Sequence, residues 1–531
     1  MKNKLPSLII NNLSSLRNFL SKKENFYFYI IFLLALSIHF YYSLIGWSHN
    51  LLDQYGFRQT QTAITTYYAI KEGFKLNYIT PVLGAPWSIP FEFPLFQWVV
   101  AGFVLLFKTP IDQTGRFISL TFFYLSLFPL YAILKAYLKK TNYVLIILSL
   151  ILLNPIYLFW SRTFMIESLA LFLGILFCWL AINLIQTKKL KFHLLVSMVG
   201  SLTALVKITT FAVLCFPTLS IFIYYFLKEK NNKFPSMEII TKYARIALSL
   251  FVIPLLAGII WTHFADVQKS INPLANGFIT SKDLTAWNFG TIQQKIDPLV
   301  WINIFKNSFV PMSVFGIIEI SDYLIPGFFV VFLLFIIFTK AYRREMLFSL
   351  LFFLSGPVIF TNLYFVHNYY FYANNFFLSI LLGLLIITCL EQKHKIKMMG
   401  SMILFPIMIF TLWSTYMKEF YPYQYRVNDS IMASTEVIKQ NTNQDGTILI
   451  YGQNWDPSFS YYAERKAIMN WQEIPLSNKK IQKSIKKTGG VSALIFSNNN
   501  DEKFITDQIK NLNFNEIPIY NDNQTRIYLP K

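Results

Sequence analysis

Residues Leu51–Trp98 read LLDQYGFRQTQTAITTYYAIKEGFKLNYITPVLGAPWSIPFEFPLFQW, and they separate two strongly apolar segments. Ionisable groups are costly to place in an apolar environment, so we expect this polar stretch to lie outside a bilayer. Its location decides the fold, because the side on which it emerges fixes the direction of every later segment. The stretch contains four prolines together with Asp53, Arg58, Gln59, Gln61 and Glu92.

The composition of the whole chain is that of a membrane protein. Of its 531 residues, 54% are hydrophobic and only 14% are charged, whereas soluble domains carry about 25% charged residues. The apolar residues occur in runs close to the roughly 20 residues that cross a bilayer as a helix. The sequence therefore predicts a polytopic α-helical membrane protein.

Charges and cysteines exclude several classes of function. The net charge is +20, but the basic clusters lie at the ends of apolar runs, which is a topology signal, so nucleic acid is not expected as a partner. Cys178, Cys215 and Cys389 each lie within an apolar run, so no disulfide framework is indicated. No histidine and cysteine spacing typical of a metal site occurs, and scattered carboxylates indicate a divalent metal only weakly.

The positive-inside rule sets the predicted topology. Residues 1–25 are basic and are placed in the cytoplasm as the start of a retained anchor. Pro94–Phe107 is apolar but short, and we interpret it as an interfacial helix, which keeps the later basic clusters, such as Lys139–Lys140, inside. The C-terminus then lies outside, after about eleven spans and two outer loops at 48–116 and 265–322. The predicted spans are Phe26–Trp47, Phe117–Leu138, Tyr143–Trp160, Ser168–Gln186, Phe192–Val206, Thr209–Leu227, Ala247–Phe264, Tyr323–Phe338, Leu347–Thr361, Phe376–Leu390 and Met398–Tyr416.

Two further segments have a distinct character. Trp301–Ile320 is interrupted by charged residues and proline, and we predict a second interfacial helix there. Residues 418–531 predict a small extracytoplasmic α/β domain after the transmembrane part at 26–417. Its tyrosines Tyr461–Tyr462 either line a carbohydrate or acceptor surface or are exposed on a packed domain. The expected strands are Gly446–Tyr451, Ala493–Ser497 and Thr525–Leu529, and the expected helices are Asp429–Gln440 and Asp501–Leu512.

The first candidate site lies in the opening stretch. If the residues after Phe57 are helical, Arg58 and Gln61 share one face. Arginine binds phosphate oxygens with two parallel hydrogen bonds, and amides such as those of Gln59 and Gln61 suit sugar hydroxyls. The alternative is a capped helix beside the membrane without a ligand.

Other candidates lie at the outer ends of the predicted spans. Glu92 is an acid between two prolines, and it either contacts a ligand or faces water at the interface. Arg162 and Glu167 lie in a predicted outer turn, where the helix dipole alone would favour Glu167 in a first turn. Lys207 could snorkel or hold a phosphate. His367 and Tyr370, in VHNYYFYANN, either bind a ligand or belong to an aromatic belt.

The order of these motifs over about residues 26–415 resembles the GT-C superfamily of glycosyltransferases that use polyprenyl-phosphate sugars. It is most similar to the protein-mannosyltransferase and aminoarabinose-transferase (ArnT-like) branch. LLDQYGFRQTQTA resembles the acid and arginine that open the first outer loop of that family, and Glu92–Trp98 looks like a shortened E-K-P-P-L-x-x-W element. The family's second acid is replaced by Gln54, and its lysine after the glutamate by Phe93.

The resemblance implies an activity and roles for residues. It implies inverting transfer of a sugar from a polyprenyl (undecaprenyl) phosphate carrier to a lipid, glycan or protein at the outer face of a bacterial cytoplasmic membrane. Asp53 would be the base, and Glu92 and Glu167 would bind sugar hydroxyls or orient cations. Arg58 and Lys207, with Arg162, would neutralise the phosphate, and Gln59, Gln61, His367 and Tyr370 would bind substrate.

Other classes stay open from the sequence. A polysaccharide polymerase or ligase would join whole lipid-linked oligosaccharides, and a protein that only binds lipid-linked sugar would lack a working base. A transporter or flippase is disfavoured, because transporters place ionisable groups near the middle of the membrane, whereas here they cluster at the outer ends of spans.

Overall fold

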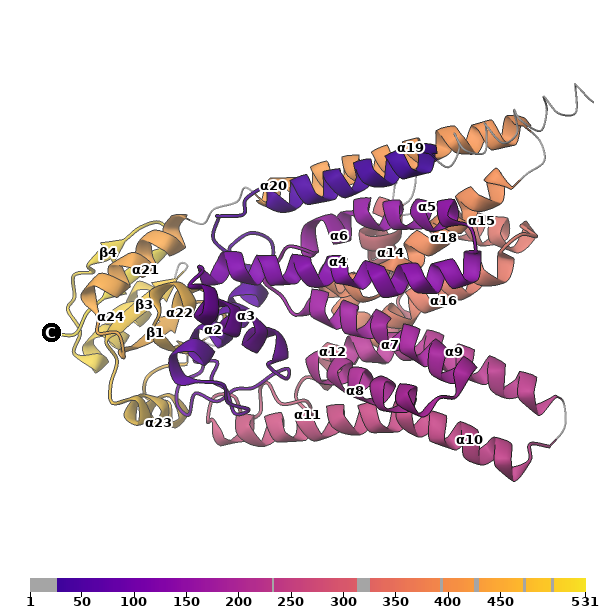
Figure 1. Cartoon of the computed structure of the whole chain (residues 1–531). Coiled ribbons are helices and arrows are strands. Elements are labelled where there is room, and N and C mark those ends of the chain that lie inside the picture. The colour runs from indigo at the N-terminus through magenta and orange to yellow at the C-terminus, as the bar shows by residue number, and fades with distance from the viewer. Residues whose placement is uncertain are drawn as a thin grey trace, which may run out of the picture.

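The computed structural model describes residues 26–231, 234–312, 325–391, 395–424, 429–470, 474–497 and 501–531. Most of these residues are helical, and the helices form an elongated bundle with a smaller α/β domain at one end (Figure 1). The helices α2 (Gly56–Glu72) and α3 (Leu95–Phe107) lie at this same end, between the bundle and the domain. The stretch Leu51–Trp98 therefore joins the two parts of the molecule.

Several helices of the bundle are long and apolar enough to cross a membrane, which makes the chain a multi-pass membrane protein. Among the described residues there are five: Phe26–Leu44, α4 (Ile111–Leu138), α7 (Glu167–Thr187), α9 (Ile208–Lys230), and the continuous segment of α10 (Met237–Ala247), a π turn (Leu248–Val252) and α11 (Ile253–Ile271). The predicted number of about eleven spans stays a prediction.

Most of the other helices are shorter, with the exception of α19, which has 25 residues. They are α5 (Thr141–Leu153), α6 (Pro155–Trp160), α8 (Leu190–Val206), α12 (Thr285–Phe289), α13 (Ile292–Ile296), α14 (Pro298–Met312), α15 (Ile325–Phe338), α16 (Arg343–Ile359), α17 (Thr361–Val366), the 3-10 helix η3 (Asn368–Ala373), α18 (Asn375–Leu390), α19 (Lys395–Glu419) and α20 (Tyr421–Gln424).

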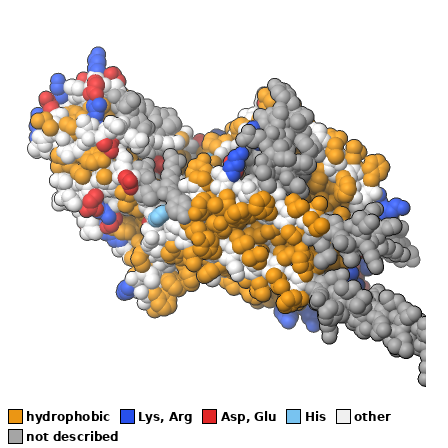
Figure 2. Space-filling model, turned by 90° about the horizontal axis from the view of Figure 1, so that it is seen from above, with side chains coloured by type: hydrophobic (Ala, Val, Ile, Leu, Met, Phe, Trp, Pro, Cys, Tyr) orange, Lys and Arg blue, Asp and Glu red, His pale blue; other side chains and the backbone are white. Residues whose placement is uncertain are grey.

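The surface of the bundle differs from that of the domain. Figure 2 shows hydrophobic side chains gathered over the middle of the molecule, with acidic and basic side chains more frequent over the α/β domain. On α11, for example, Leu256, Ile259 and Ile260 are exposed. Such a wide apolar surface needs an apolar solvent, and lipid chains provide one.

Some predicted boundaries were wrong. Tyr143–Trp160 is not one span but two helices, because Pro155 has no N–H to continue α5 and the Asn154 side chain instead caps α6 by accepting from Ile156 N at 3.0 Å. The helix α4 begins at Ile111, before the predicted span Phe117–Leu138, and α11 continues to Ile271, beyond the predicted span Ala247–Phe264. The bounds of the two outer loops stay predictions.

The predicted interfacial segments have different outcomes. The segment Pro94–Phe107 forms α3, which packs on α2 and α4 at the domain end (Figure 1), and its interfacial position stays a prediction. The segment Trp301–Ile320 begins as α14, which starts at Pro298, while residues 313–320 lie outside the described part.

The C-terminal domain contains a five-stranded sheet in the order β2-β1-β3-β5-β4, with β2, β1 and β3 parallel and β5 antiparallel to both neighbours. The expected strands and helices are present, but β2 and β4 were missed because both are short and partly polar. The bounds are β1 (Thr447–Tyr451), β2 (Lys466–Asn470), β3 (Ala493–Ser497), β4 (Tyr520–Asn521), β5 (Thr525–Tyr528), α21 (Asp429–Asn441), α22 (Ser458–Ala463), α23 (Lys479–Thr488) and α24 (Glu502–Leu512).

The first outer loop extends this sheet. The N–H groups of Ala467 and Met469 in β2 donate to the carbonyls of Pro81 and Val82, each at 2.9 Å, and Gly84 N donates back to Ala467 O at 3.0 Å. One hydrophobic core includes residues of the first loop, the second outer segment and the sheet: Val82, Leu83, Ile89, Ala275, Ile279, Ile448 and Ala467. The C-terminal domain is therefore completed by both outer loops.

Replacing Gly84 by alanine should weaken the pairing between this loop and β2. Gly84 has a φ of +74°, and an added Cβ would collide with Ser484 Oγ. Gly73 has a similar φ of +92° with open space around it, so Gly73→Ala carries only the backbone cost of roughly 1–2 kcal/mol. We expect Gly84→Ala to lower the melting temperature more than Gly73→Ala does and to expose the domain to protease. Equal shifts in the two variants would contradict a stabilising contact between the loop and the sheet.

Candidate functional site

The polar residues expected from the sequence form two clusters near the domain end of the bundle. We call Asp53, Gln59, Arg116 and Arg162 the Asp53 cluster, and Arg58, Gln61, Glu92, Glu167 and Lys207 the Glu92 cluster. Both clusters use α2, because neighbouring helical residues such as Arg58 and Gln59 point roughly 100° apart.

The Asp53 cluster is buried. Asp53 Oδ2 lies 3.2 Å from Arg162 Nη1 and 4.0 Å from Arg116 Nη2, and Oδ1 accepts from Gln59 Nε2. Gln59 Oε1 accepts from Phe164 N at 3.2 Å. The side chains of Arg116 and Arg162 are fully buried, and that of Asp53 is 3% exposed. One carboxylate therefore faces two guanidinium groups.

Arg116 also binds the backbone in front of Asp53. Its Nη1 donates to the carbonyls of Trp47 and His49 at 2.7 and 2.6 Å, and its Nη2 donates to Asn50 O at 2.9 Å. The sequence did not identify Arg116 as a site residue, although a single arginine in the first turns of an apolar helix is a signal for a buried partner. The arginine fixes the segment before Asp53 to α4.

The Glu92 cluster connects α2 with the loop before α3. Arg58 Nη1 donates to Gln61 Oε1 at 2.6 Å, as expected for neighbours on one helix face, and Nη2 lies 3.4 Å from Glu92 Oε2. Gln97 Nε2 donates to Glu92 Oε1 at 3.0 Å. Burial opposes the charge of Arg58, but Glu92 and Glu167 raise the pKa of Arg58 above its usual value, so the guanidinium stays charged.

Lys207 brings a second cation to this cluster. It lies in the break between α8 and α9, with extended backbone at φ −157°, and Nζ donates to Glu167 Oε1 at 2.6 Å. Glu167 stands in the first turn of α7, as the helix dipole favours. Its other oxygen, Oε2, is buried without a hydrogen-bond partner in the described part of the chain.

Aromatic rings cover Lys207. Its Nζ lies 4.6 Å from the ring centre of Tyr370 and 5.5 Å from that of Tyr369. His367 stacks on Tyr369, with ring centres 5.1 Å apart. Burial, followed by the charges of Arg58 and Lys207, lowers the pKa of His367 to about 4, so this imidazole is neutral at pH 7. Tyr369 was not among the predicted site residues.

The clusters differ in what they can do. In the Glu92 cluster, two cations and two acids stand beside amides and rings, which is suited to an anionic ligand carrying hydroxyl groups. In the Asp53 cluster, the ion pairs hold chain segments together. Among the described residues, no group of three or more His, Cys, Asp or Glu side chains is arranged to hold a metal ion.

Arg116→Met should destabilise the protein strongly. The change leaves three backbone carbonyls and part of the Asp53 charge without their buried partner, and we expect a loss of about 3–5 kcal/mol in the free energy of unfolding. Arg343→Met is the matched control, because Arg343 is exposed and donates to one carbonyl, Ile337 O, at 3.3 Å. Equal losses of unfolding free energy in denaturant titrations of the two purified variants would contradict the role of Arg116 in fixing the segment before Asp53 to α4.

His367 should make the protein less stable in acid. Its pKa is about 4 when folded against an ordinary value of 6.5, so the unfolded chain binds more protons between these values, and stability falls as the pH drops through this window. Between pH 7.5 and 5 the wild type should lose on the order of 1–2 kcal/mol more than His367→Gln. Melting curves at both pH values test this, with His263→Gln as the control substitution.

Comparisons with known proteins place the fold. No protein-family profile matches the sequence, and no curated protein matches it. The structure is similar to that of ArnT from Cupriavidus metallidurans bound to undecaprenyl phosphate, with a TM-score of 0.59 and 9% identity over 93% of this chain and 97% of that one.

The apo form of the same ArnT gives a TM-score of 0.59 and 10% identity with the same coverage. The oligosaccharyltransferase AglB from Archaeoglobus fulgidus, in complex with an inhibitory peptide and a dolichol-phosphate, gives 0.49 and 11% identity over 88% of this chain and 69% of that one. The chain thus has the fold of ArnT, a GT-C glycosyltransferase, as the order of its polar motifs had indicated.

Proposed function

We propose that this protein is a membrane glycosyltransferase that moves a sugar from a polyprenyl phosphate carrier to an acceptor at the outer face of a bacterial cytoplasmic membrane. The observation that carries the proposal is the Glu92 cluster of an ArnT-like fold, in which the ion pairs of Arg58 with Glu92 and of Lys207 with Glu167 lie close enough for Arg58 and Glu92 to act electrostatically on Lys207. ArnT with this fold has been captured with undecaprenyl phosphate, a ligand whose phosphate such a pair of cations would bind.

The two cations have donors left for a phosphate. A guanidinium group carries five N–H donors and an ammonium group three, and the ion pair of Arg58 with Glu92 is long at 3.4 Å. Arg58 can bind two phosphate oxygens side by side, and Lys207 adds a point charge. Together they stabilise the negative charge that develops on the carrier phosphate as the sugar leaves.

Other groups of the cluster suit the sugar. Glu167 Oε2 is a buried acceptor without a partner in the described chain, and a sugar hydroxyl would satisfy it. Gln97 Oε1 is likewise buried and unpartnered among the described residues. Tyr370 and His367 would cover the ring from the side of η3.

The reaction itself is a single displacement with inversion. The acceptor hydroxyl oxygen forms a bond to the anomeric carbon while the bond from that carbon to the phosphate oxygen breaks, and the hydroxyl proton passes to a carboxylate. We assign this carboxylate to Asp53. A carboxylate offers about four acceptor positions, so Asp53 can receive a hydroxyl while it remains bound to Gln59 and Arg162. Glu167 is the competing candidate, because one of its oxygens is unpaired.

A binding assay with undecaprenyl phosphate, run beside a transfer assay in membranes with a radiolabelled undecaprenyl-phosphate sugar, tests the phosphate site. A hydrogen bond to a charged group contributes roughly 1.5–3 kcal/mol, so Arg58→Gln and Lys207→Met should each weaken binding of undecaprenyl phosphate about 10- to 100-fold. Lys188→Met is the control: Lys188 also forms an ion pair, with Glu229 at 2.7 Å, but near the C-terminal end of α9, whereas Lys207 precedes the first residue of that helix. Unchanged binding in both site variants would refute the proposal.

The same assay separates the two candidate bases. Asp53→Asn should lower turnover by about 10²–10⁴ while undecaprenyl phosphate still binds, and Glu167→Gln should mainly raise the KM for the donor. The reverse result would move the base to Glu167. The product also distinguishes a single-sugar transferase from a polymerase or ligase, since the latter would add whole oligosaccharides.

A further inference from the structure

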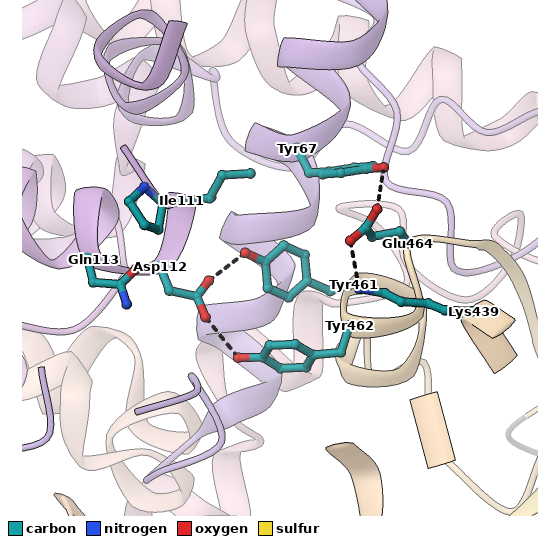
Figure 3. Close-up of a pocket in the computed structure, with 9 residues that line it drawn as sticks. Tyr67, Ile111, Asp112, Gln113, Lys439, Tyr461, Tyr462 and Glu464 are labelled. Carbon is teal, nitrogen blue, oxygen red and sulfur yellow. Dashed lines mark hydrogen bonds and ion pairs between the residues drawn. The ribbon is translucent and has the colours of Figure 1, made fainter. Parts of the chain in front are cut away.

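A cavity of about 250 Å³ lies where the C-terminal domain meets the membrane bundle. Its walls come from α2, the first turn of α4, and the segments around α21 and α22 (Figure 3). None of the residues assigned to the Glu92 cluster lines it. The cavity is partly open, and its lining combines apolar ring and aliphatic surface with a few polar groups, as ligand pockets usually do, so it is a candidate for a second ligand position.

One wall centres on Asp112. Tyr461 OH donates to Asp112 Oδ1 at 2.5 Å, and Tyr462 OH donates to Oδ2 at 3.2 Å. Figure 3 shows both phenol groups pointing at this carboxylate. Tyr462 OH also accepts from Leu51 N at 2.6 Å, so the wall is fixed to the segment that leads to Asp53.

The opposite wall centres on Glu464. Its Oε1 accepts from Lys439 Nζ at 2.7 Å and its Oε2 accepts from Tyr67 OH at 3.2 Å. About a third of the Lys439 and Glu464 side chains is exposed, at 34% and 37%. Their charges cancel, so Asp112 leaves the cavity with a slight excess of negative charge.

Gln113, which lines the cavity, has an amide oxygen that forms no hydrogen bond within the described chain. This oxygen, Oε1, is buried. A buried acceptor without a partner costs free energy, and a donor from a ligand would satisfy it. The unpartnered amide oxygen of Gln113 contributes nothing to the contact between the C-terminal domain and the bundle.

We propose that this cavity is a subsite for the saccharide part of the acceptor. Phenol rings, carboxylates and an amide together offer stacking surfaces and acceptors for hydroxyl groups. An anionic group would meet Asp112 and Glu464 without a free cation, so the ligand is an uncharged or amine-bearing sugar. This assignment rests on the proposed function, because it names the sugar as the acceptor.

The position of the cavity agrees with that role. Asp112 stands one helical turn before Arg116, which lies 4.0 Å from Asp53. The cavity therefore borders the Asp53 cluster, whereas the cations assigned to the donor phosphate lie in the Glu92 cluster. An acceptor held there would approach the proposed base from the side away from the carrier phosphate.

Binding of simple sugars to the full-length protein in lipid nanodiscs tests the subsite. The probes are the methyl glycosides of glucose, galactose, mannose, N-acetylglucosamine and 4-amino-arabinose, observed by saturation-transfer difference NMR. We expect at least one probe to bind the wild type and to lose at least fivefold in affinity in Gln113→Ala and in Tyr461→Ala. Gln186→Ala is the matched control, because this amide donates to a tyrosine, Tyr225, and neither residue lines the cavity.

The outcomes separate the subsite from the proposed function. No binding of any probe to the wild type, or equal binding by all four proteins, overturns the subsite and leaves a contact between domains only. Loss of undecaprenyl phosphate binding in Gln113→Ala also overturns it, by assigning the cavity to the donor. If undecaprenyl phosphate fails to bind the wild type, the proposed function falls, while the probe titrations still decide whether the cavity binds sugar.

Discussion

The burial of Asp53 between Arg116 and Arg162 is the constraint on which the domain end of the bundle depends. A buried charge is tolerated only when it is paired and hydrogen-bonded, and here one carboxylate and two guanidinium groups satisfy each other across three chain segments. Arg116 also donates from Nη1 and Nη2 to backbone carbonyls between Trp47 and Asn50. The first helix of the bundle, α4 and the turn before α7 are thereby held in one arrangement.

This arrangement orients α2, and α2 in turn separates the clusters. Gln59 faces the ion pairs, while Arg58 turns toward Glu92 and the loop before α3. The break between α8 and α9 then brings Lys207 to Glu167, opposite Arg58. A rigid electrostatic core thus supports a neighbouring site in which cations keep spare donors, which is the preorganisation that binding of a phosphate requires.

Sequence reasoning predicted what depends on neighbours in the chain. The shared face of Arg58 and Gln61 and the place of Glu167 in a first helical turn both follow from helical geometry, and both are confirmed. The pairs that join distant segments, such as Lys207 with Glu167, could not be derived from spacing. Arg116 was missed because its partners are mainly backbone carbonyls, which no side-chain pattern reveals. The pairing of β2 with the loop between α2 and α3 joins residues far apart in the chain, so spacing could not reveal it either.

That strand pairing has a consequence for how the protein is made. Pro81 and Val82 find hydrogen-bond partners in the C-terminal domain, at Ser460, Ala467 and Met469, which are synthesised hundreds of residues later. Contacts of such long sequence separation form slowly, and the exposed edge meanwhile invites mispairing. The loop between α2 and α3 therefore reaches its final pairing only after the C-terminal domain has been synthesised. Assembly of the site is coupled to completion of biosynthesis, so truncated chains would remain without a finished site.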